Sequence, residues 1–291
     1  MLKYNYSVII PFRDCTDFLR VACASIPVRD DVQVIVVDNA KEPIGAEAII
    51  SFNNPHIEYY TSSPFKGAGC ARNEGLKHAK GKFLLFLDAD DYFTPDAFSI
   101  FDKELNNDFD IVYFNATSIV LQTGMMGNRH YTIDSNIKKA INGNEDVLRY
   151  QFVNPVCKMV RRELVEKNAI QFQEVPASND LMFSVMTGHY ASKVKAVDKI
   201  VYVITVGEVG SSLTRTLSVC NEEARFHVMV DWYLFLKEIK RLDMSPRILG
   251  FVLKGYRLFG VKTGTKWLSY ALKHKVNIFK FRKLIKYNVT T

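Results

Sequence analysis

The sequence predicts an α/β protein that is built on a mostly parallel sheet with helices on its faces. Runs of mainly apolar residues, such as 32–37 and 83–87, are typical of strands that are buried on both sides. Between these runs lie segments whose apolar residues recur at helical spacing, as Phe18, Leu19 and Ala22 do. Because strands and helices alternate along the first third of the chain, we expect βαβ units, which make parallel sheets.

The elements of the first third follow one another at short intervals. Thr16 is suited to cap the first helix, because a hydroxyl can accept from the free backbone nitrogens of a first turn. The glycine-bearing loop that begins at Gly67 is expected to run into a helix. In order, the expected elements are a strand at 6–11, a helix from Thr16, a strand at 32–37, a helical stretch at 46–52, a strand at 57–60, the loop and helix from Gly67, and a strand at 83–87.

The middle of the chain continues this pattern less regularly. Thr94-Pro95-Asp96 predicts a helix start, since a capping threonine, a proline and an acid suit the first turn. The segment at 122–144 is polar and contains glycine, so we expect a mobile loop over the site. The remaining expected elements are a strand at 110–114, a helix start at 144–146, a strand turning into a helix at 158–164, a helix from Ser178, and a strand at 199–206.

Three carboxylates, Asp88, Asp90 and Asp91, come directly after the strand at 83–87. They therefore stand at its carboxyl end, where open α/β sheets bind their ligands. An Asp-x-Asp pair offers the oxygen ligands that Mg²⁺ or Mn²⁺ prefers, and a metal held in this way usually also binds phosphates. The alternative interpretation is a strand followed by a solvated acidic turn, because aspartate is common in turns.

Other candidate site residues follow neighbouring elements and should meet the acids in one crevice. Arg72 could brace phosphates or pair with the acids, and Asp38 could bind a base or ribose. Their alternatives are an ordinary helix-start residue and a turn residue. The Gly67-x-Gly69 loop could place backbone nitrogens against phosphate, but it lacks the further glycine of a dinucleotide fingerprint, so no NAD-binding fold is expected. The segment Pro11-Phe12-Arg13 completes the set.

Composition excludes several classes of protein. Hydrophobic residues make up 48% and charged residues 24% of the 291 residues, as in ordinary globular proteins. The five cysteines are scattered and lack metal-ligand spacing, which is typical of a reduced, cytosolic protein. No apolar window of about 18 residues predicts a membrane-spanning helix. The first residues run straight into a strand, so we expect no signal peptide and a cytoplasmic location.

The net charge of +7 is unevenly distributed. From residue 237 onward, fourteen lysines and arginines face two acids, a net charge of +12, so the preceding residues carry −5. We therefore predict two domains, a catalytic domain at 1–215 and a basic helical extension at 216–291. Its helices could lie on an anionic membrane surface or simply pack on the sheet. Nucleic acid is not an expected partner, because no recognition motif is present.

Five sequence blocks in a fixed order resemble the family 2 glycosyltransferases of GT-A fold. Weaker resemblance continues in Lys158–Leu164, in Asn179-Asp180 and in Gly210–Thr214. The resemblance implies a mostly parallel, Rossmann-like sheet flanked by helices, with a C-terminal helical extension. The five blocks are Ser7-Val8-Ile9-Ile10-Pro11, Ile35-Val36-Val37-Asp38, Gly69-x-x-Arg72-Asn73-x-Gly75-Leu76, Phe86-Leu87-Asp88-Ala89-Asp90-Asp91 and Pro95.

The resemblance also implies an activity, namely inverting transfer of a sugar from a nucleotide-sugar to an acceptor hydroxyl. Asp180 would be the general base, and Asp90 and Asp91 would hold Mn²⁺ or Mg²⁺. Asp38 would bind the nucleoside, with uracil expected, and Asp88 would face the ribose or sugar. The expected acceptor is a saccharide or lipid-linked saccharide of a cell-surface or capsular polysaccharide. The remaining expected donor contacts are Pro11, Phe12, Arg13, Gly67, Arg72 and Ala89.

The sequence departs from the family pattern at two positions near these acids. Asn39 replaces the second acid of the block that ends the second strand, and Asn179 replaces the glutamate before the expected base. These departures motivate an alternative interpretation. The chain would then be a non-catalytic, glycosyltransferase-like scaffold whose basic extension docks on a membrane or a partner.

Overall fold

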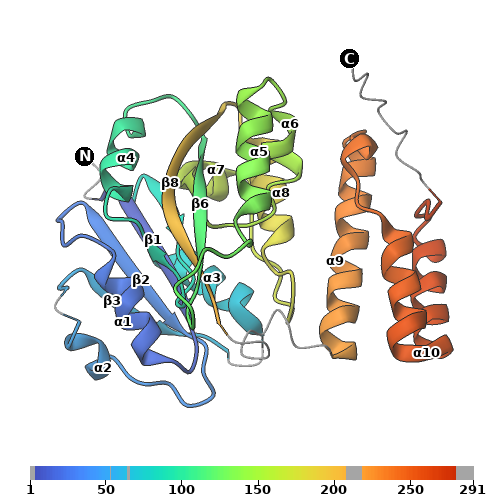
Figure 1. Ribbon diagram of the computed structural model, residues 1–291, viewed down its shortest axis with the longest axis horizontal. Coiled ribbons are helices and arrows are strands. Elements are labelled where there is room, and N and C mark those ends of the chain that lie inside the picture. The colour runs from blue at the N-terminus through green and yellow to red at the C-terminus, as the bar shows by residue number, and fades with distance from the viewer. Residues whose placement is uncertain (1–3, 53, 64–65, 208–217, 280–291) are drawn as a thin grey trace. The chain divides into compact units, whose positions relative to one another are not determined.

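The computed structural model of the chain describes residues 4–52, 54–63, 66–207 and 218–279. Contacts between Cα atoms divide the chain into two compact units, 1–216 and 217–291. The first unit contains a sheet with helices, and the second unit is helical within its described part (Figure 1). None of the described helices is both long enough and apolar enough to cross a membrane.

Among the described residues, eight strands form one sheet at the centre of the first unit, in the order β3-β2-β1-β4-β7-β6-β8-β5. Six strands run parallel to one another, while β7 and β5 are antiparallel to their neighbours. The expected α/β fold with a mostly parallel sheet is thus confirmed. The strands are β1 (Tyr6–Phe12), β2 (Val32–Asp38), β3 (Ile57–Thr61), β4 (Phe83–Phe86), β5 (Tyr92–Phe93), β6 (Ile111–Val120), β7 (Lys158–Arg161) and β8 (Val194–Val206).

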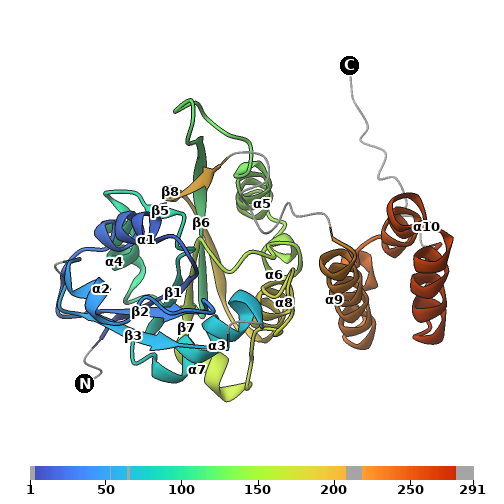
Figure 2. The same ribbon diagram turned by 90° about the horizontal axis from the view of Figure 1, so that it is seen from below.

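Helices cover both faces of this sheet, with α1 and α4 on one face and α3, α7 and α8 on the other (Figure 2). The helices of the first unit are α1 (Thr16–Ala24), α2 (Glu47–Ile50), α3 (Gly67–His78), α4 (Ala97–Glu104), α5 (Tyr131–Ile141), α6 (Asp146–Tyr150), α7 (Arg162–Lys167) and α8 (Leu181–Tyr190).

Two residues of β1 show why both faces are apolar. Tyr6 and Ile9 are fully buried and point to opposite sides, because side chains alternate along a strand. The Tyr6 ring packs edge to face on Phe98 of α4, with 5.8 Å between the ring centroids. On the other side, Gly75 of α3 lies so close that a Cβ atom there would be 2.5 Å from Ile9 Cγ2. The missing side chain therefore lets α3 approach the sheet.

The structure differs from the expected elements in several places. The segment at 122–144, expected to be a mobile loop, contains α5, which buries Ile133 and Ile137 on one face. Gly67 begins α3 directly, so the expected glycine loop is the first turn of a helix. The last strand begins at Val194 rather than 199, because its first half pairs with β6. The family-like segment 210–214 lies outside the described residues.

The second unit contains α9 (Val219–Glu238), a short 3₁₀ helix η2 (Leu242–Met244) and α10 (Ile248–Lys273). Gly260, with φ 84° and ψ 177°, breaks α10 into two halves that fold back on each other (Figure 1). A Cβ atom on Gly264 would lie 2.2 Å from the Tyr256 ring across this turn. Trp267 is fully buried and stacks on Phe226 of α9, so the two halves and α9 share one apolar core.

Candidate active site

The acid segment after β4 forms a tight turn at the carboxyl end of that strand. The backbone nitrogen of Asp91 donates to the carbonyl oxygen of Asp88 at 3.0 Å. The side chain of Asp88 is 38% exposed, Asp90 is exposed and Asp91 is buried. The three carboxylates therefore differ in accessibility, and only Asp88 and Asp90 offer oxygens to solvent or to a ligand.

Asp91 is held by β8, which lies three positions beyond β4 in the strand order, with β7 and β6 between them. Its Oδ1 accepts from the backbone nitrogen of Thr205 at 2.7 Å, and its carboxylate also bonds the hydroxyl of Tyr202. The hydroxyl of Thr205 donates to the carbonyl oxygen of Asp90. Burial, together with the charges of Asp90 and Asp88, raises the pKa of Asp91 well above its usual range. We conclude that Asp91 anchors the turn.

Asp90 has a different environment. Its side chain is accessible to solvent, yet the protein around it displaces enough water to raise its pKa, and the charge of Asp88 raises it further. Arg129, on the connection between β6 and α5, and Arg72 act in the opposite direction. Asp90 is thus an open carboxylate in a region where negative charge is already concentrated, which favours a cation there.

Arg72 joins the acid turn to the start of α8. Its guanidinium donates from Nη2 to Asp88 Oδ1 at 2.6 Å and from Nη1 to Asn179 Oδ1 at 2.8 Å. The group lies over the ring of Phe172, 5.4 Å from its centroid, and its side chain is only 7% exposed. Arg72 therefore bridges two segments that are far apart in sequence, and Nη1 and Nη2 are used within the protein.

Asp180 is the residue that precedes α8, and its side chain makes no cap on that helix. Burial raises the pKa of Asp180, the charges of Arg72 and Lys158 lower it, and that of Asp88 raises it. Asp180 is thus near both cations and near the acid turn. Lys158 of β7 is itself buried, which lowers its pKa to about 7, and its Nζ donates to the carbonyl oxygen of Phe152 at 2.8 Å.

The segment before Asp180 is fixed against α3. Asn73 and Phe172 form a reciprocal pair, because the Asn73 amide donates to the Phe172 carbonyl at 3.0 Å and accepts from its backbone nitrogen at 2.8 Å. A Cβ atom on Gly69 would lie 2.2 Å from the carbonyl oxygen of Gln173, and Gly67 has a positive φ of 71°. The absence of a side chain at Gly69 therefore lets α3 approach this segment closely, and the phosphate contact expected for Gly67 stays a prediction.

Asp38 lies at the end of β2 and is fully buried. Its carboxylate accepts from the backbone nitrogens of Ala40 at 2.8 Å and Ile44 at 2.9 Å, and from the Tyr59 hydroxyl at 2.8 Å. These bonds fix the loop after β2. A direct contact of Asp38 with a nucleoside stays a prediction, and it would require a ligand to reach a carboxylate that is fully buried here.

Residues 7–168 match the model of Glycosyl transferase family 2, a match that covers more than half of the chain. The chain belongs to this family. The expectation from the five sequence blocks is therefore confirmed. EpsH of Bacillus subtilis (strain 168), named as a glycosyltransferase, is 23% identical over 211 residues, which are 67% of this chain and 59% of EpsH. The chain thus spans less than two thirds of that relative.

Two solved glycosyltransferases share the fold of this family member. Staphylococcus aureus TarS 1–349 in complex with UDP-GlcNAc superposes with a TM-score of 0.72 and 18% identity, covering 93% of this chain and 80% of the TarS 1–349 fragment. The mannosyltransferase PcManGT from Pyrobaculum calidifontis, in complex with GDP-Man and Mn²⁺, superposes with a TM-score of 0.57 and 17% identity, covering 92% of this chain and 75% of PcManGT. The GT-A fold is thereby confirmed.

The structure brings Arg72, Asp88, Asp90 and Asp180 together: Arg72 is hydrogen-bonded to Asp88, and the charges of both residues act on Asp90 and Asp180. Arg13 is exposed and pairs with Asp14 on the surface, with 3.1 Å between Nε and Oδ2. Ala89 lies within the acid turn, between Asp88 and Asp90. The roles expected for Pro11, Phe12 and Ala89 in binding the donor stay predictions.

Several residues that shape this site carry no signal of it in the sequence. Tyr202 and Thr205 hold the acid turn, yet they lie in a strand whose β-branched pattern gives no signal of function. Lys158 was recognised only as part of a sequence block, because burial cannot be read from one lysine. Arg129 lies in a segment that was expected to be a loop over the site, so its effect on Asp90 agrees with that position.

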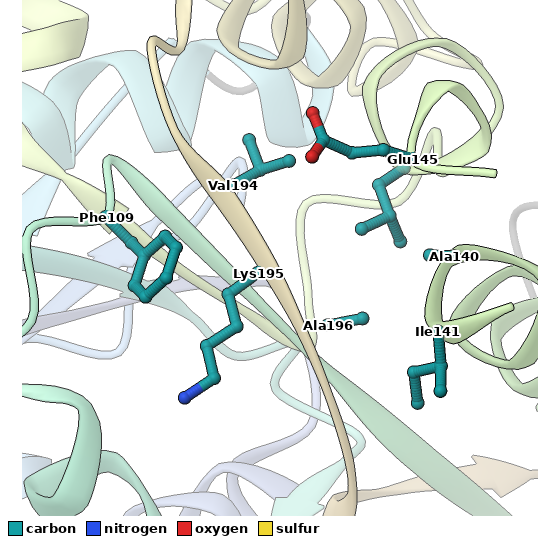
Figure 3. A pocket seen from close by; sticks show the side chains of 8 residues that line it. Phe109, Ala140, Ile141, Glu145, Val194, Lys195 and Ala196 are labelled. Atoms are coloured by element: carbon teal, nitrogen blue, oxygen red, sulfur yellow. The ribbon is translucent and has the colours of Figure 1, made fainter. Parts of the chain in front are cut away.

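A separate hollow of about 290 Å³ lies elsewhere in the first unit (Figure 3). Phe109 precedes β6 and Val194 begins β8, so the hollow lies at the amino ends of these parallel strands, opposite to the edge with Asp88. Lys195 there is paired with Glu104. The hollow is lined by Phe109, Ala140, Ile141, Glu145, Leu148, Val194, Lys195 and Ala196.

Proposed function

We propose that this protein is an inverting glycosyltransferase that transfers a sugar from a UDP-sugar to a hydroxyl of a saccharide or lipid-linked saccharide. The observation that carries the proposal is the pair of hydrogen bonds from the Arg72 guanidinium. They join Asp88 of the acid turn to Asn179, the residue before Asp180. Acidic donor-side groups and a candidate base thus lie at one edge of the sheet, where such folds bind ligands.

Asp180 is the proposed general base. The acceptor oxygen attacks the anomeric carbon on the face opposite to the diphosphate, while Asp180 takes the hydroxyl proton. The bond from the anomeric carbon to the diphosphate oxygen breaks, and its electron pair leaves with the nucleoside diphosphate. A single displacement of this kind inverts the anomeric centre. Burial, which raises the pKa of Asp180, brings this carboxylate closer to the range that suits proton transfer near neutral pH.

The carboxylates of the acid turn fit a divalent cation that also binds the diphosphate of the UDP-sugar. No three His, Cys, Asp or Glu side chains gather into a complete ligand set among the residues that the structure describes. Mg²⁺ and Mn²⁺ sites commonly use one or two carboxylates together with substrate phosphates, and the accessible Asp90 suits that arrangement. A bound cation would neutralise charge on the departing diphosphate. Asp91 would need to release Thr205 to become a ligand.

UDP is the proposed nucleotide because a structural neighbour, TarS, binds UDP-GlcNAc. TarS is named a poly(ribitol-phosphate) β-N-acetylglucosaminyltransferase, so one relative acts on a polymer. We extend this by proposing cell-surface polysaccharide synthesis as the context and the cytoplasm as the location. Asp38 would act mainly by ordering the loop after β2, since its oxygens already bind Ala40, Ile44 and Tyr59.

Docking of the second unit on an anionic membrane is the second candidate function. At the turn of α10, Leu258 and Val261 are exposed apolar residues, 42% and 74% accessible, and exposed Arg257 and Lys262 flank them. Apolar side chains beside cations suit a surface of anionic lipid. Sedimentation with vesicles of anionic or neutral lipid tests this, and equal binding to both would contradict it.

Turnover separates the proposed enzyme from the scaffold alternative. The full chain is incubated with a panel of UDP-sugars and Mn²⁺, and sugar transfer or hydrolysis is measured by release of UDP. Asp180→Asn is expected to lower kcat by about 10²–10⁴-fold while UDP binding is retained. Asp17→Asn, an exposed acid in α1, is the matched control. If no UDP-sugar is bound or turned over with or without Mn²⁺, the scaffold interpretation is favoured.

A further inference from the structure

Asn179 is a buried amide between two functional segments. It accepts from Arg72 Nη1 at 2.8 Å, and a guanidinium has no acceptor, so the Asn179 oxygen must face Arg72. The backbone carbonyl oxygen of Asn179 accepts a hydrogen bond from the backbone nitrogen of Gln173 at 3.2 Å. A Cβ atom on Gly69 would come within 2.9 Å of Asn179 Cβ, so α3 presses on this residue. Aspartate has the same shape as asparagine, so Asn179→Asp adds a charge with the least change in packing.

Arg72 depends on Asn179 for half of its bonding. The guanidinium uses Nη2 for Asp88 and Nη1 for Asn179, while the buried Nε has no hydrogen-bond partner among the described residues. Losing the Asn179 amide would leave Arg72 held by one carboxylate and by the face of Phe172. The amide thus fixes the direction of the guanidinium as well as its place.

Asp180 is surrounded by charges from three elements. Arg72 of α3 and Lys158 of β7 are cations, and Asp88 of the acid turn is an anion. Arg72 is already paired with Asp88, so one carboxylate offsets its charge. A second carboxylate at position 179 would offset that charge again and would place a like charge beside Asp180. The neutral amide avoids both effects.

We propose that Asn179 is a positioning residue whose uncharged amide fixes Arg72 and leaves its positive charge to keep Asp180 ionised. The inference rests on the proposed function, in which Asp180 is the base. It extends that function by assigning a role to a position that departs from the family pattern.

The test measures Asp180 directly and requires no substrate. The full chain is labelled with ¹³C at aspartate carboxyl carbons, and the Asp180 signal is assigned by its loss in Asp180→Asn. In Asn179→Asp, the midpoint of the Asp180 titration is expected to rise by about one pH unit, because a like charge is added nearby. Asn144→Asp adds the same charge at an exposed position before α6, and it should leave the midpoint of the Asp180 titration unchanged. An unmoved midpoint in Asn179→Asp overturns the proposal.

A second variant keeps the proposal testable if Asn179→Asp does not fold. Asn179→Ala removes the anchor without adding charge, so the Asp180 midpoint should move by less than half of the aspartate effect, whereas UDP-sugar turnover should fall about tenfold. Wild-type turnover in Asn179→Ala would overturn the positioning role. Failure of the proposed function looks different, because Asp180→Asn would then retain full turnover while the titration results could still hold.

Discussion

The hydroxyl of Tyr202 lies 3.0 Å from the backbone nitrogen of Asp88, from which it accepts a hydrogen bond, and it also bonds the carboxylate of Asp91. A buried phenol in β8 thus holds both ends of a four-residue acid turn that follows β4. Burial and the charges of Asp91 and Asp88 raise the pKa of Tyr202 well above its usual range, so the hydroxyl keeps its proton at working pH.

Tyr202→Phe is expected to loosen the acid turn. The change leaves the Asp88 nitrogen and one Asp91 oxygen without their partner, which costs about 1–3 kcal/mol of stability. Affinity for UDP with Mn²⁺ should fall about tenfold, as measured by titration calorimetry. Tyr190→Phe, at a residue that is 45% exposed, is the matched control. Unchanged affinity in Tyr202→Phe would mean that β8 does not shape the site.

Asp90→Asn tests the proposed cation contact. A neutral amide binds divalent cations more weakly than a carboxylate, so the Mn²⁺ concentration for half-maximal UDP binding should rise at least tenfold. Asp96→Asn, also exposed and only six residues further on, should leave this concentration unchanged. If both variants bind UDP with the wild-type dependence on Mn²⁺, Asp90 is not a metal ligand.

Gly69→Ala is expected to separate α3 from the segment before Asp180. The new Cβ would lie 2.2 Å from the Gln173 oxygen and 2.9 Å from Asn179 Cβ, and backbone cannot yield cheaply. Such overpacking costs about 1–3 kcal/mol, and turnover should fall with it. Gly250→Ala, in α10, should be neutral or slightly stabilising, because no atom of the described residues lies within 4 Å of the added Cβ. Thermal unfolding and UDP release measure the two effects.

Lys158 makes the stability of the first unit depend on pH. Its folded pKa is lowered to about 7, while an unfolded lysine titrates near 10.4, so above pH 7 the unfolded chain binds the extra proton. The contribution of Lys158 to the free energy of unfolding therefore rises by about 2 kcal/mol between pH 7 and pH 9. Lys158→Met should lose this rise, and the exposed Lys139→Met should keep it.

Hydrogen exchange of peptides from β6 and β7 is the suitable measurement for the Lys158 variants. Both tryptophans, Trp232 and Trp267, belong to the second unit, so fluorescence would follow the wrong part of the chain. If the stability of Lys158→Met rises with pH as much as that of Lys139→Met, groups other than Lys158 determine the pH dependence.

Most of the fold could be predicted from the sequence, because the patterns that indicate strands and helices are local. The apolar runs that become β1, β2 and β4, and the acids that follow β4, need no partner to be recognised. The network at the site could not be predicted, since its bonds join residues such as Arg72 and Asn179 that are 107 positions apart. The pattern at 131–141 was hidden because α5 buries only one narrow apolar face in an otherwise polar stretch.

The hydrogen bonds from β8 to the acid turn also determine when during synthesis the site can form. Asp91 is hydrogen-bonded to Thr205, 114 residues later in the chain, and Thr205 belongs to β8, the last strand that the structure describes in the first unit. Contacts of such long sequence separation form late in folding. A nascent chain would therefore expose an unanchored acid turn until residue 206 has left the ribosome. Truncation before β8 should yield a chain that retains β1 to β4 pairing but lacks an ordered donor edge.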